Sequence, residues 1–400
     1  MTSKLDITPF IPQESALLRH GIFDLVTRLD RQAARLTGMV PTESANTIRR
    51  HMAVINSYYS NLIEGNRTLP HEIRQAQRGY YSEDPVKRDY QLESVAHIKV
   101  QEWIASQELT LETVCCTEFI LALHRRFYEG LPESLRQVSD EKGAVAMVEP
   151  GQWRQRNVTV GRHVPPDANV LASLMEGFCD EYRSARYPGN NRLISLACAH
   201  HRFLWIHPFM DGNGRVVRLW TDALFRAQGV ESYGLWCLSR GLARNSSAYK
   251  AALAQADYSA QGASDGRGPL SQERLALFCK FMLETALDQV SYISDLLALD
   301  GLLERTRSYI AARNDGRIPG VVGKYKPLAA LLLYNAFLAG SLERADALDL
   351  TGMPERSARR LLAQLKEDGL LSETSSRSSL KWEIPEHAEP FYFPQLAPGA

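Results

Sequence analysis

The stretch HPFMDGNGRVVR, His207 to Arg218, packs one histidine, one aspartate, two glycines around an asparagine and two arginines into twelve residues. Before it, NRLISLACAHHRFLWI carries apolar residues three and four positions apart, which predicts a core helix that ends near Pro208. The residues after Arg215 take the same spacing, so we expect a second helix to begin at Gly214 or Arg215. The stretch is therefore predicted to be a loop between two helices.

The start of that second helix is a candidate phosphate site. Free backbone N–H groups and the helix dipole favour an anion there. Gly212 and Gly214 let the backbone come close to a phosphate. Arg215 and Arg218 can each clamp free phosphate oxygens with a planar guanidinium group. Asp211 offers the hard oxygen ligand with which Mg²⁺ is held beside substrate phosphates.

His207 supplies a group that exchanges protons near neutral pH. Pro208 is expected to restrict its backbone to extended conformations and so to aim the ring into the loop, and the amide of Asn213 can donate to a phosphate oxygen. Each feature alone has a plainer interpretation, namely a helix-end histidine, a glycine turn or a solvated arginine face. Their combination at this spacing indicates a base beside a Mg²⁺–polyphosphate, which suits phosphoryl or nucleotidyl transfer to a hydroxyl.

The stretch resembles the signature of the Fic family, H-P-F-x-[D/E]-G-N-G-R-x-x-R, and matches it at every specified position. The resemblance implies a helical core that binds ATP and Mg²⁺ and transfers AMP to a tyrosine, serine or threonine hydroxyl of a protein, with pyrophosphate leaving. It implies that His207 is the general base and Asp211 the Mg²⁺ ligand. It also implies an anion hole formed by Gly212, Asn213 and Gly214. Arg215 and Arg218 would hold the β and γ phosphates.

Two further segments resemble parts of the same family, and the similarity spans about residues 48–297. GQWRQRNVTVGRHVPP resembles the flap hairpin, which aligns a target by strand addition, and its alternation predicts a strand over residues 157–161. The alternative is a purely structural hairpin. The target-docking residues would be Asn157, Val158, Thr159 and Val160. SRGLARNSSAYKAAL resembles the segment that lines the adenine pocket, which implicates Asn245 and Tyr249, while the plainer role of Tyr249 is that of a core residue.

SNLIEGN, Ser60 to Asn66, ends a helical stripe of apolar residues that begins near Thr47. Ser60 and Glu64 are four positions apart on one helix face. The segment resembles the family's inhibitory motif, [S/T]-x-x-x-E-[G/N]. The resemblance implies that Glu64 pairs with Arg218 in the place of the γ-phosphate, so that ATP binds unproductively. The plainer interpretation is a glutamate at a helix end before a glycine cap.

The composition of the 400 residues is that of a globular protein, with 44% apolar and 23% charged residues. Lys and Arg total 46, as do Asp and Glu, so no overall charge indicates a nucleic-acid or membrane partner. The six cysteines form no C-x-x-C pair, which argues against a zinc site and favours a reducing compartment. Because the sequence shows neither a signal pattern nor a membrane-spanning run, we expect a cytoplasmic protein.

Residues 341–371, SLERADALDLTGMPERSARRLLAQLKEDGLL, predict a helix, a turn at Gly352 and a second helix. The second helix is expected to bury Ala358, Leu361, Leu362 and Leu365. With the alternating stretch LKWEI, residues 380–384, this segment resembles a winged helix-turn-helix. Residues 301–380 carry 12 Lys and Arg against 9 Asp and Glu, a net charge of only +3. DNA binding is therefore one interpretation, and protein contact or dimerisation through the same fold is the other.

These features predict a mainly α protein with a Fic-type helical core, a small β-hairpin flap and a winged helix-turn-helix domain. The expected division is an amino-terminal helical region with the inhibitory helix over residues 1–110, the catalytic core over 111–300 and the winged helix over 301–400. The expected function is ATP- and Mg²⁺-dependent adenylylation of protein hydroxyls, with self-modification and homo-oligomers as further expectations and no membrane partner. The alternatives are removal of AMP from a modified protein, in which Glu64 would position a water, and a DNA-binding regulator.

Overall fold

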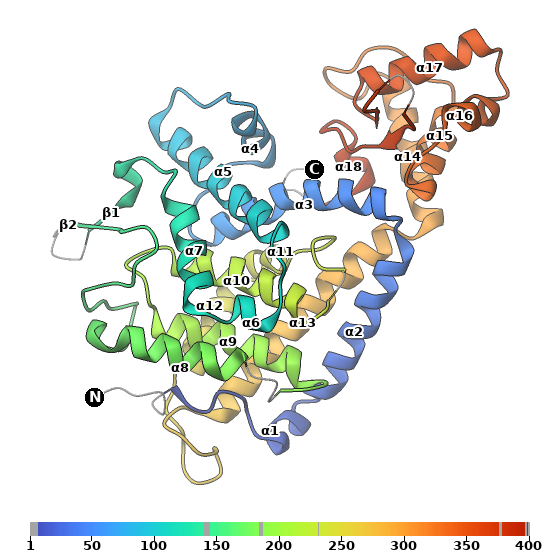
Figure 1. Cartoon of the computed structure of the whole chain (residues 1–400). Helices are drawn as coiled ribbons and strands as arrows, with labels where there is room; N and C mark the ends of the chain where they lie inside the picture. The colour runs from blue at the N-terminus through green and yellow to red at the C-terminus, as the bar shows by residue number, and fades with distance from the viewer. Residues whose placement is uncertain are drawn as a thin grey trace. The chain divides into compact units, whose positions relative to one another are not determined.

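A computed structural model of the chain describes residues 7–139, 145–183, 187–230, 232–375, 378–396 and 398. The described chain is mainly helical, as the sequence predicts (Figure 1). The helices, in chain order, are α1 (Glu14–Arg19), α2 (Ile22–Met39), α3 (Thr42–Ile63), α4 (Pro70–Gln77), α5 (Pro85–Ala105), α6 (Leu111–Val114), α7 (Thr117–Tyr128), η2 (Glu133–Arg136), η3 (Ala168–Val170), α8 (Leu171–Arg183), α9 (Asn191–Ile206), α10 (Asn213–Ala227), α11 (Leu238–Arg244), α12 (Ser246–Ala256), α13 (Gln272–Leu296), α14 (Leu299–Asn314), α15 (Leu328–Ala339), α16 (Arg344–Thr351), α17 (Glu355–Glu367) and α18 (Glu389–Tyr392).

Two short antiparallel strand pairs accompany the helices in the described ranges. β1 (Gln137–Ser139) pairs with β2 (Val145–Met147), and β3 (Leu371–Ser372) pairs with β4 (Lys381–Trp382). Strand pairs of two or three residues bury little apolar surface by themselves. The core of the protein is therefore made by helix packing.

The contacts divide the chain into two compact units. The first holds the residues up to 33 together with 56–233 and 237–289, and the second holds 34–55, 234–236 and 290–400. The first unit contains all three stretches that the sequence singles out, residues 60–66, 151–166 and 207–218. The sequence-based division into three domains stays a prediction.

The core of the first unit is built around α9 and α10, which pack against each other. Val216, Leu219 and Trp220 of α10 are completely buried, as their helical spacing predicts. The Trp220 ring lies 5.8 Å from that of Phe203 on α9, and its indole N–H donates to the Val114 carbonyl at 2.7 Å. This packing fixes the two helices that carry the loop of residues 207–212.

The ends of the two helices follow from backbone conformation. α9 ends at Ile206 because His207 adopts the left-handed conformation, with φ 49° and ψ 62°. The extended conformation expected before a proline was wrong, and Arg154 holds the observed backbone by donating to the His207 carbonyl at 2.9 Å. α10 begins at Asn213, directly after Gly212 with φ 78°. The predicted loop between two helices is confirmed, and the second helix starts one residue earlier than the sequence indicated.

The second unit contains the predicted helix-turn-helix elements. Gly352 ends α16 in the left-handed conformation, with φ 56°. α17 follows and buries the four predicted residues, Ala358, Leu361, Leu362 and Leu365. Leu342 bridges to Leu380 just before β4. The two helices and the turn between them are therefore present, and the winged helix stays a prediction.

Two expectations about elements were wrong. The strand expected over residues 157–161 is reduced to one bridge between Val160 and His163, because Gly161 turns the chain back with φ 61°. The β1–β2 pair lies earlier in the chain instead. The sequence also predicts one long helix over about residues 272–312, but the structure divides it into α13 and α14, because Ala298 has an extended ψ of 129°.

Two properties expected from composition can be compared with the structure. No helix among the described residues has the length and apolar character needed to cross a membrane. The cysteines are free thiols, and they are buried except for Cys116, which is half-buried. Burial raises the pKa of the Cys115 thiol to about 12. Such thiols behave as small apolar core residues, as the sequence indicated.

Candidate active site

The start of α10 faces the end of α3, and Arg218 joins the two. Arg218 is 2% exposed and donates from Nε to the Ser60 hydroxyl at 2.9 Å and from Nη2 to the Ser60 carbonyl at 2.9 Å. Nη2 also donates to Glu64 Oε1 at 2.7 Å. The Ser60 carbonyl lies in the last turn of α3, where carbonyls lack helical partners and attract a cation. The Glu64–Arg218 pair implied by the sequence resemblance is therefore present as a contact.

Glu64 places its carboxylate against the first turn of α10. A Cβ on Gly214 would lie 2.2 Å from Glu64 Oε1, so only glycine leaves room for this approach. Burial raises the pKa of Glu64, but the charges of Arg218 and Arg215 outweigh it and hold the pKa below its ordinary value. An ionised carboxylate thus lies where the helix start favours an anion.

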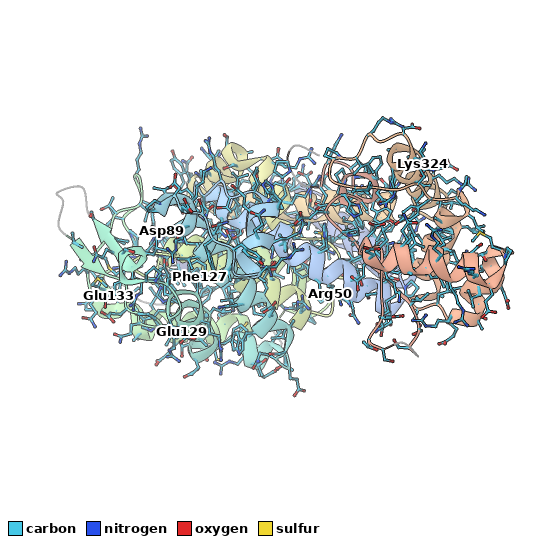
Figure 2. The ribbon with its side chains drawn as sticks, turned by 90° about the horizontal axis from the view of Figure 1, so that it is seen from above. Arg50, Asp89, Phe127, Glu129, Glu133 and Lys324 are labelled. Carbon is cyan, nitrogen blue, oxygen red and sulfur yellow. The ribbon has the colours of Figure 1, made fainter. Side chains whose placement is uncertain are left out.

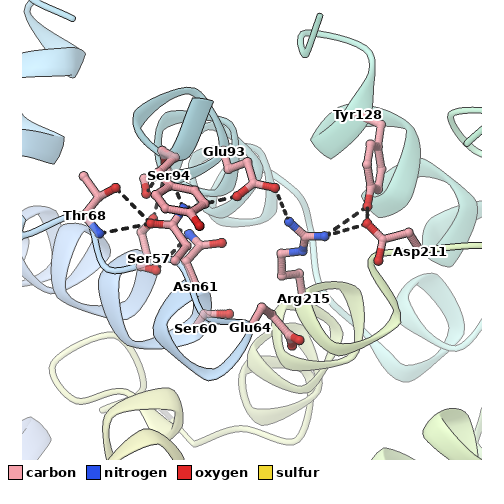
Figure 3. Close-up of polar contacts among 12 residues, drawn as sticks. Ser57, Ser60, Asn61, Glu64, Thr68, Glu93, Ser94, Tyr128, Asp211 and Arg215 are labelled. Atoms are coloured by element: carbon pink, nitrogen blue, oxygen red, sulfur yellow. Dashed lines mark hydrogen bonds and ion pairs between the residues drawn. The ribbon is translucent and has the colours of Figure 1, made fainter. Parts of the chain in front are cut away.

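Arg215, one turn before Arg218, is held by two carboxylates (Figure 3). Its Nη1 donates to Glu93 Oε1 of α5 at 2.6 Å, and its Nη2 donates to Asp211 Oδ2 at 2.8 Å. The Tyr128 hydroxyl donates to Asp211 Oδ2 at 2.5 Å and accepts from Arg215 at 3.1 Å. The guanidinium also lies 4.8 Å from the ring of Phe127, which Figure 2 labels. These contacts fix Arg215 beside Asp211.

His207 lies at the junction of α9 and the loop. Burial lowers the pKa of its imidazole to about 4, and the positive charge of Arg154 contributes in the same direction. The ring is therefore neutral near pH 7 and able to accept a proton. Arg154 Nε donates to the His207 carbonyl at 2.9 Å, so the backbone of the proposed base is also held in place.

Gly212 and Asn213 shape the loop. A Cβ on Gly212 would lie 2.8 Å from the Tyr128 ring, so a larger residue would displace that tyrosine. The Asn213 amide donates to the Phe209 carbonyl at 2.8 Å, and its oxygen accepts the Phe209 N–H at 2.9 Å. One N–H of the amide thus closes the loop, and donation to a phosphate from its second N–H stays a prediction. The backbone N–H groups at the start of α10 remain as anion donors.

Asp211 is the carboxylate that fits a magnesium ion. Burial raises its pKa, but Arg215 and the Tyr128 hydroxyl outweigh it and lower the pKa. Among the described residues, no three His, Cys, Asp or Glu side chains come together as a metal site of their own. One ionised carboxylate that shares the ion with phosphate oxygens and waters is a mode that suits Mg²⁺. The donor set thus fits an ion that arrives with a nucleotide.

The two residues expected at an adenine pocket lie in different surroundings. Asn245 is exposed at the junction of α11 and α12. Tyr249 is 2% exposed, and its hydroxyl lies 2.7 Å from His200 Nε2. Burial raises the pKa of Tyr249, and the charges of Arg218 and Glu64 also act on it. Tyr249 is thus a core residue behind the phosphate end of the site, which matches its plainer interpretation.

The four residues expected to dock a target lie in the segment that precedes α8. Thr159 and Val160 are exposed, and Val158 is half-buried. Asn157 is engaged within the protein, because its amide donates to Asp167 Oδ1 at 2.8 Å and its oxygen accepts the Ala168 N–H at 2.9 Å. Asn157 therefore closes the base of the segment, and the other three residues remain available to a partner.

Sequence reasoning missed three residues that contact the site, namely Glu93, Tyr128 and Arg154. Glu93 and Tyr128 come from helices far from the motif in sequence, and no spacing rule links them to it. Arg154 stands just before the four expected docking residues, where a single arginine is indistinguishable in sequence from a surface residue.

The comparisons with known proteins agree with this geometry. A family model described as "Fic/DOC family" matches residues 114–225. Over 206 residues the chain is 31% identical to "Protein adenylyltransferase Fic" of Drosophila willistoni, a match that covers 50% of this chain. The matched part is only 38% of the length of that relative.

Two solved structures share the fold. A Fic family protein from Desulfovibrio desulfuricans G20 has a TM-score of 0.52 and 19% identity, and the match covers 90% of this chain and 96% of that one. Fic-1 (residues 134–508) from C. elegans has a TM-score of 0.54 and 15% identity, over 70% of this chain and 74% of that one. Residues 114–225 are thus similar to the Fic/DOC family, and the two solved structures show a shared fold.

Proposed function

We propose that the chain is a protein adenylyltransferase, which transfers AMP from ATP to a tyrosine, serine or threonine hydroxyl of a target protein. The relative named a protein adenylyltransferase supports Fic-type AMP transfer at the level of the family. The single observation that carries the proposal is the gathering of His207, Asp211, Arg215 and Arg218 around the start of α10. We also propose the three-part domain division, with the core over residues 111–300.

The residues divide the reaction among them. The target hydroxyl oxygen bonds to the α-phosphorus, the bond to the β-phosphate breaks, and pyrophosphate leaves. His207, neutral near pH 7, accepts the hydroxyl proton. Arg215 and Arg218 hold the β and γ phosphates, and the helix start stabilises the negative charge that develops. Asp211 would hold Mg²⁺, which supplies charge neutralisation at the phosphates.

Glu64 restrains this site in the proposed resting state. Its carboxylate already accepts a hydrogen bond from Nη2 of Arg218, and Arg218 is the side chain proposed to bind the γ-phosphate. ATP must therefore break the ion pair or bind with its phosphates displaced. Regulation would consist of moving the end of α3 away from α10.

The proposal is tested with ATP labelled at either the α or the γ phosphorus. The Glu64→Gly chain should incorporate the α label and not the γ label into protein, and Glu64→Gly/His207→Ala should incorporate neither. Incorporation of the γ label would show phosphoryl transfer instead. Release of AMP from a modified protein by the wild-type chain, lost in Glu64→Gly, would favour the alternative in which Glu64 orients a water.

For the second unit we propose a winged helix that binds DNA through α17. Arg356, Arg359 and Arg360 are exposed on that helix, on the side opposite its buried leucines, although Glu355 pairs with Arg359 at 2.6 Å. Arg356→Ala and Arg360→Ala should weaken binding of a DNA duplex and flatten its salt dependence, without affecting AMP transfer. The charge-matched control is Arg28→Ala, an exposed arginine of α2. Absence of any affinity at low salt would make the domain a protein-contact module.

A further inference from the structure

Arg154 is a buried arginine whose guanidinium is bonded only to main-chain oxygens among its described hydrogen bonds. It is 2% exposed. Its Nε donates to the His207 carbonyl at 2.9 Å, its Nη1 to the Arg156 carbonyl at 2.9 Å, and its Nη2 to the Pro166 carbonyl. A planar fork with donors on three sides reaches three carbonyls at once, which a lysine ammonium on a flexible chain does not reproduce.

The first of these carbonyls belongs to the proposed base. His207 has φ 49°, a conformation that costs free energy for any residue with a Cβ. Arg154 Nε holds the His207 carbonyl, and the backbone N–H of Arg154 donates to the next carbonyl, that of Pro208, at 2.9 Å. Two successive carbonyls, at the histidine and directly after it, are therefore anchored to one residue. The direction of the imidazole follows from that backbone.

The other two carbonyls bracket the flap segment, which we define as residues 157–167. Arg156 precedes it and Pro166 lies near its end, so Arg154 draws its two ends together. The side chain of Asn157 also joins the two ends of the flap segment, through hydrogen bonds with Asp167 and Ala168. His163 Nε2 lies 2.6 Å from the Trp205 carbonyl, which fastens the segment to the last turn of α9. The flap segment is thus a closed loop attached beside His207.

We propose that Arg154 is a positioning residue that sets the place of the His207 imidazole relative to the flap segment, and so relative to a hydroxyl presented by a docked protein. The inference rests on the proposed function, in which the flap segment aligns the target and His207 accepts its proton. A base must come within hydrogen-bonding distance of the proton that it removes. A displacement of about 1 Å in such a geometry lowers a rate by roughly a hundredfold.

The test compares Arg154→Lys with Arg88→Lys, the same change at an exposed arginine of α5, both in the Glu64→Gly background. The acceptor is the inactive His207→Ala form of the same chain, and the donor is ATP labelled at the α phosphorus. Arg154→Lys should lower kcat by roughly ten- to a hundredfold and leave the KM for ATP unchanged. Arg88→Lys should match its parent in both constants.

Asn157→Ala separates docking of the acceptor on the flap segment from positioning of the His207 imidazole. It loosens the flap segment without touching a contact of His207. It should therefore raise the KM for the acceptor more than it lowers kcat, whereas Arg154→Lys lowers kcat. Thermal unfolding of each variant shows whether it is folded, and Arg154→Gln replaces Arg154→Lys if the lysine variant is not.

A second readout does not depend on AMP transfer. The NMR signals of the His207 imidazole should shift in Arg154→Lys and stay in place in Arg88→Lys. If the parent transfers no AMP while the signals shift, the proposed function fails and the positioning of His207 by Arg154 stands. Unshifted signals in a folded Arg154→Lys chain, or a kcat equal to that of Arg88→Lys, would overturn the inference.

Discussion

Arg215 and Arg218 are neighbours on one face of α10, yet they have different partners. Arg218 has one carboxylate, Glu64, whose side chain is 39% exposed. Arg215 has two, Glu93 and Asp211. An incoming polyphosphate therefore meets one arginine with a displaceable partner and one that is already fixed beside the proposed metal ligand. In the proposed resting state, Glu64 would therefore restrain the site through Arg218 alone.

The role of His207 as a base leads to the first prediction. His207→Ala should abolish AMP transfer while ATP affinity stays close to that of the parent, because the imidazole acts on the incoming hydroxyl and not on the phosphates. Calorimetric titration with ATP and the transfer assay measure the two quantities. The control is His71→Ala, an exposed histidine of α4. A loss of ATP affinity as large as the loss of rate would contradict this role.

The role of Asp211 as a metal ligand leads to the second. Asp211→Ala should remove both activity and its dependence on Mg²⁺ concentration, because Asp211 is the carboxylate proposed to hold the ion beside the phosphates. Asp180→Ala, at an exposed aspartate of α8, is the matched control. Turnover that still rises with added Mg²⁺ in Asp211→Ala would assign the ligand to another residue.

At the scale of elements, the proposed restraint is the contact between the end of α3 and the start of α10. A hydrogen bond between charged groups contributes about 1.5–3 kcal/mol, and the partial exposure of Glu64 places this pair near the lower end. Glu64→Gly should therefore accelerate AMP transfer by roughly tenfold or more, and Glu64→Asp, one methylene shorter, by less. Initial rates with labelled ATP measure this. Equal rates for wild type and Glu64→Gly would return Glu64 to a plain helix-end residue.

The partner of Glu64 supplies the control for this prediction. Arg218→Ala removes the phosphate clamp together with the partner of the glutamate, so it should lose activity. The double variant Glu64→Gly/Arg218→Ala should be as inactive as Arg218→Ala alone, because the two residues act through one contact. A double variant as fast as Glu64→Gly would show that Arg218 does not hold the nucleotide.

The elements also show what the sequence predicts and why it falls short. The 3.6-residue spacing of apolar side chains predicted α3, α9, α10 and α17. α17 buries one face as that spacing implies, whereas α9 and α10 are buried on nearly all sides. Alternation failed at residues 157–161, where the segment is held by side-chain contacts such as that of Asn157 rather than by a strand ladder. The break at Ala298 has no glycine or proline within it, so no local signal marked it.

At the scale of the whole molecule, buried histidines determine the response to acid. Burial lowers the pKa of His97 and His200 to about 3 and that of His124 and His207 to about 4. Their unfolded pKa is about 6.5, so the unfolded state binds more protons as the pH falls below that value. The free energy of unfolding should therefore fall between about pH 6.5 and pH 4. Burial raises the pKa of Asp222 to about 6, so this carboxyl acts in the opposite direction, but it is a single group against four histidines.

The expected loss between pH 7 and pH 5 is at least about 2 kcal/mol, observable as a lower thermal midpoint. His200→Gln should reduce the pH dependence of that midpoint, since the glutamine does not titrate. His71→Gln, at an exposed histidine, should leave it unchanged. A midpoint that is constant from pH 7 to pH 5 would mean that these histidines are not buried in the neutral form.

The candidate site was predictable where its residues share one stretch, and not where it depends on the whole fold. His207, Asp211 and the two arginines stand in twelve residues, so their chemistry is legible in the sequence. Glu93 and Arg154 reach the same place from other elements. Only the packed chain brings such residues together, because no periodicity relates them to the motif.

The central claim is that this site transfers AMP to protein hydroxyls under the restraint of Glu64. The most direct measurement is mass spectrometry of the proteins of a lysate incubated with ATP, Mg²⁺ and the Glu64→Gly chain. We expect tyrosine, serine or threonine side chains that carry AMP, absent when the chain also carries His207→Ala and fewer with the wild-type chain. Phosphate in place of AMP, or AMP at equal levels with the His207→Ala chain, would contradict it.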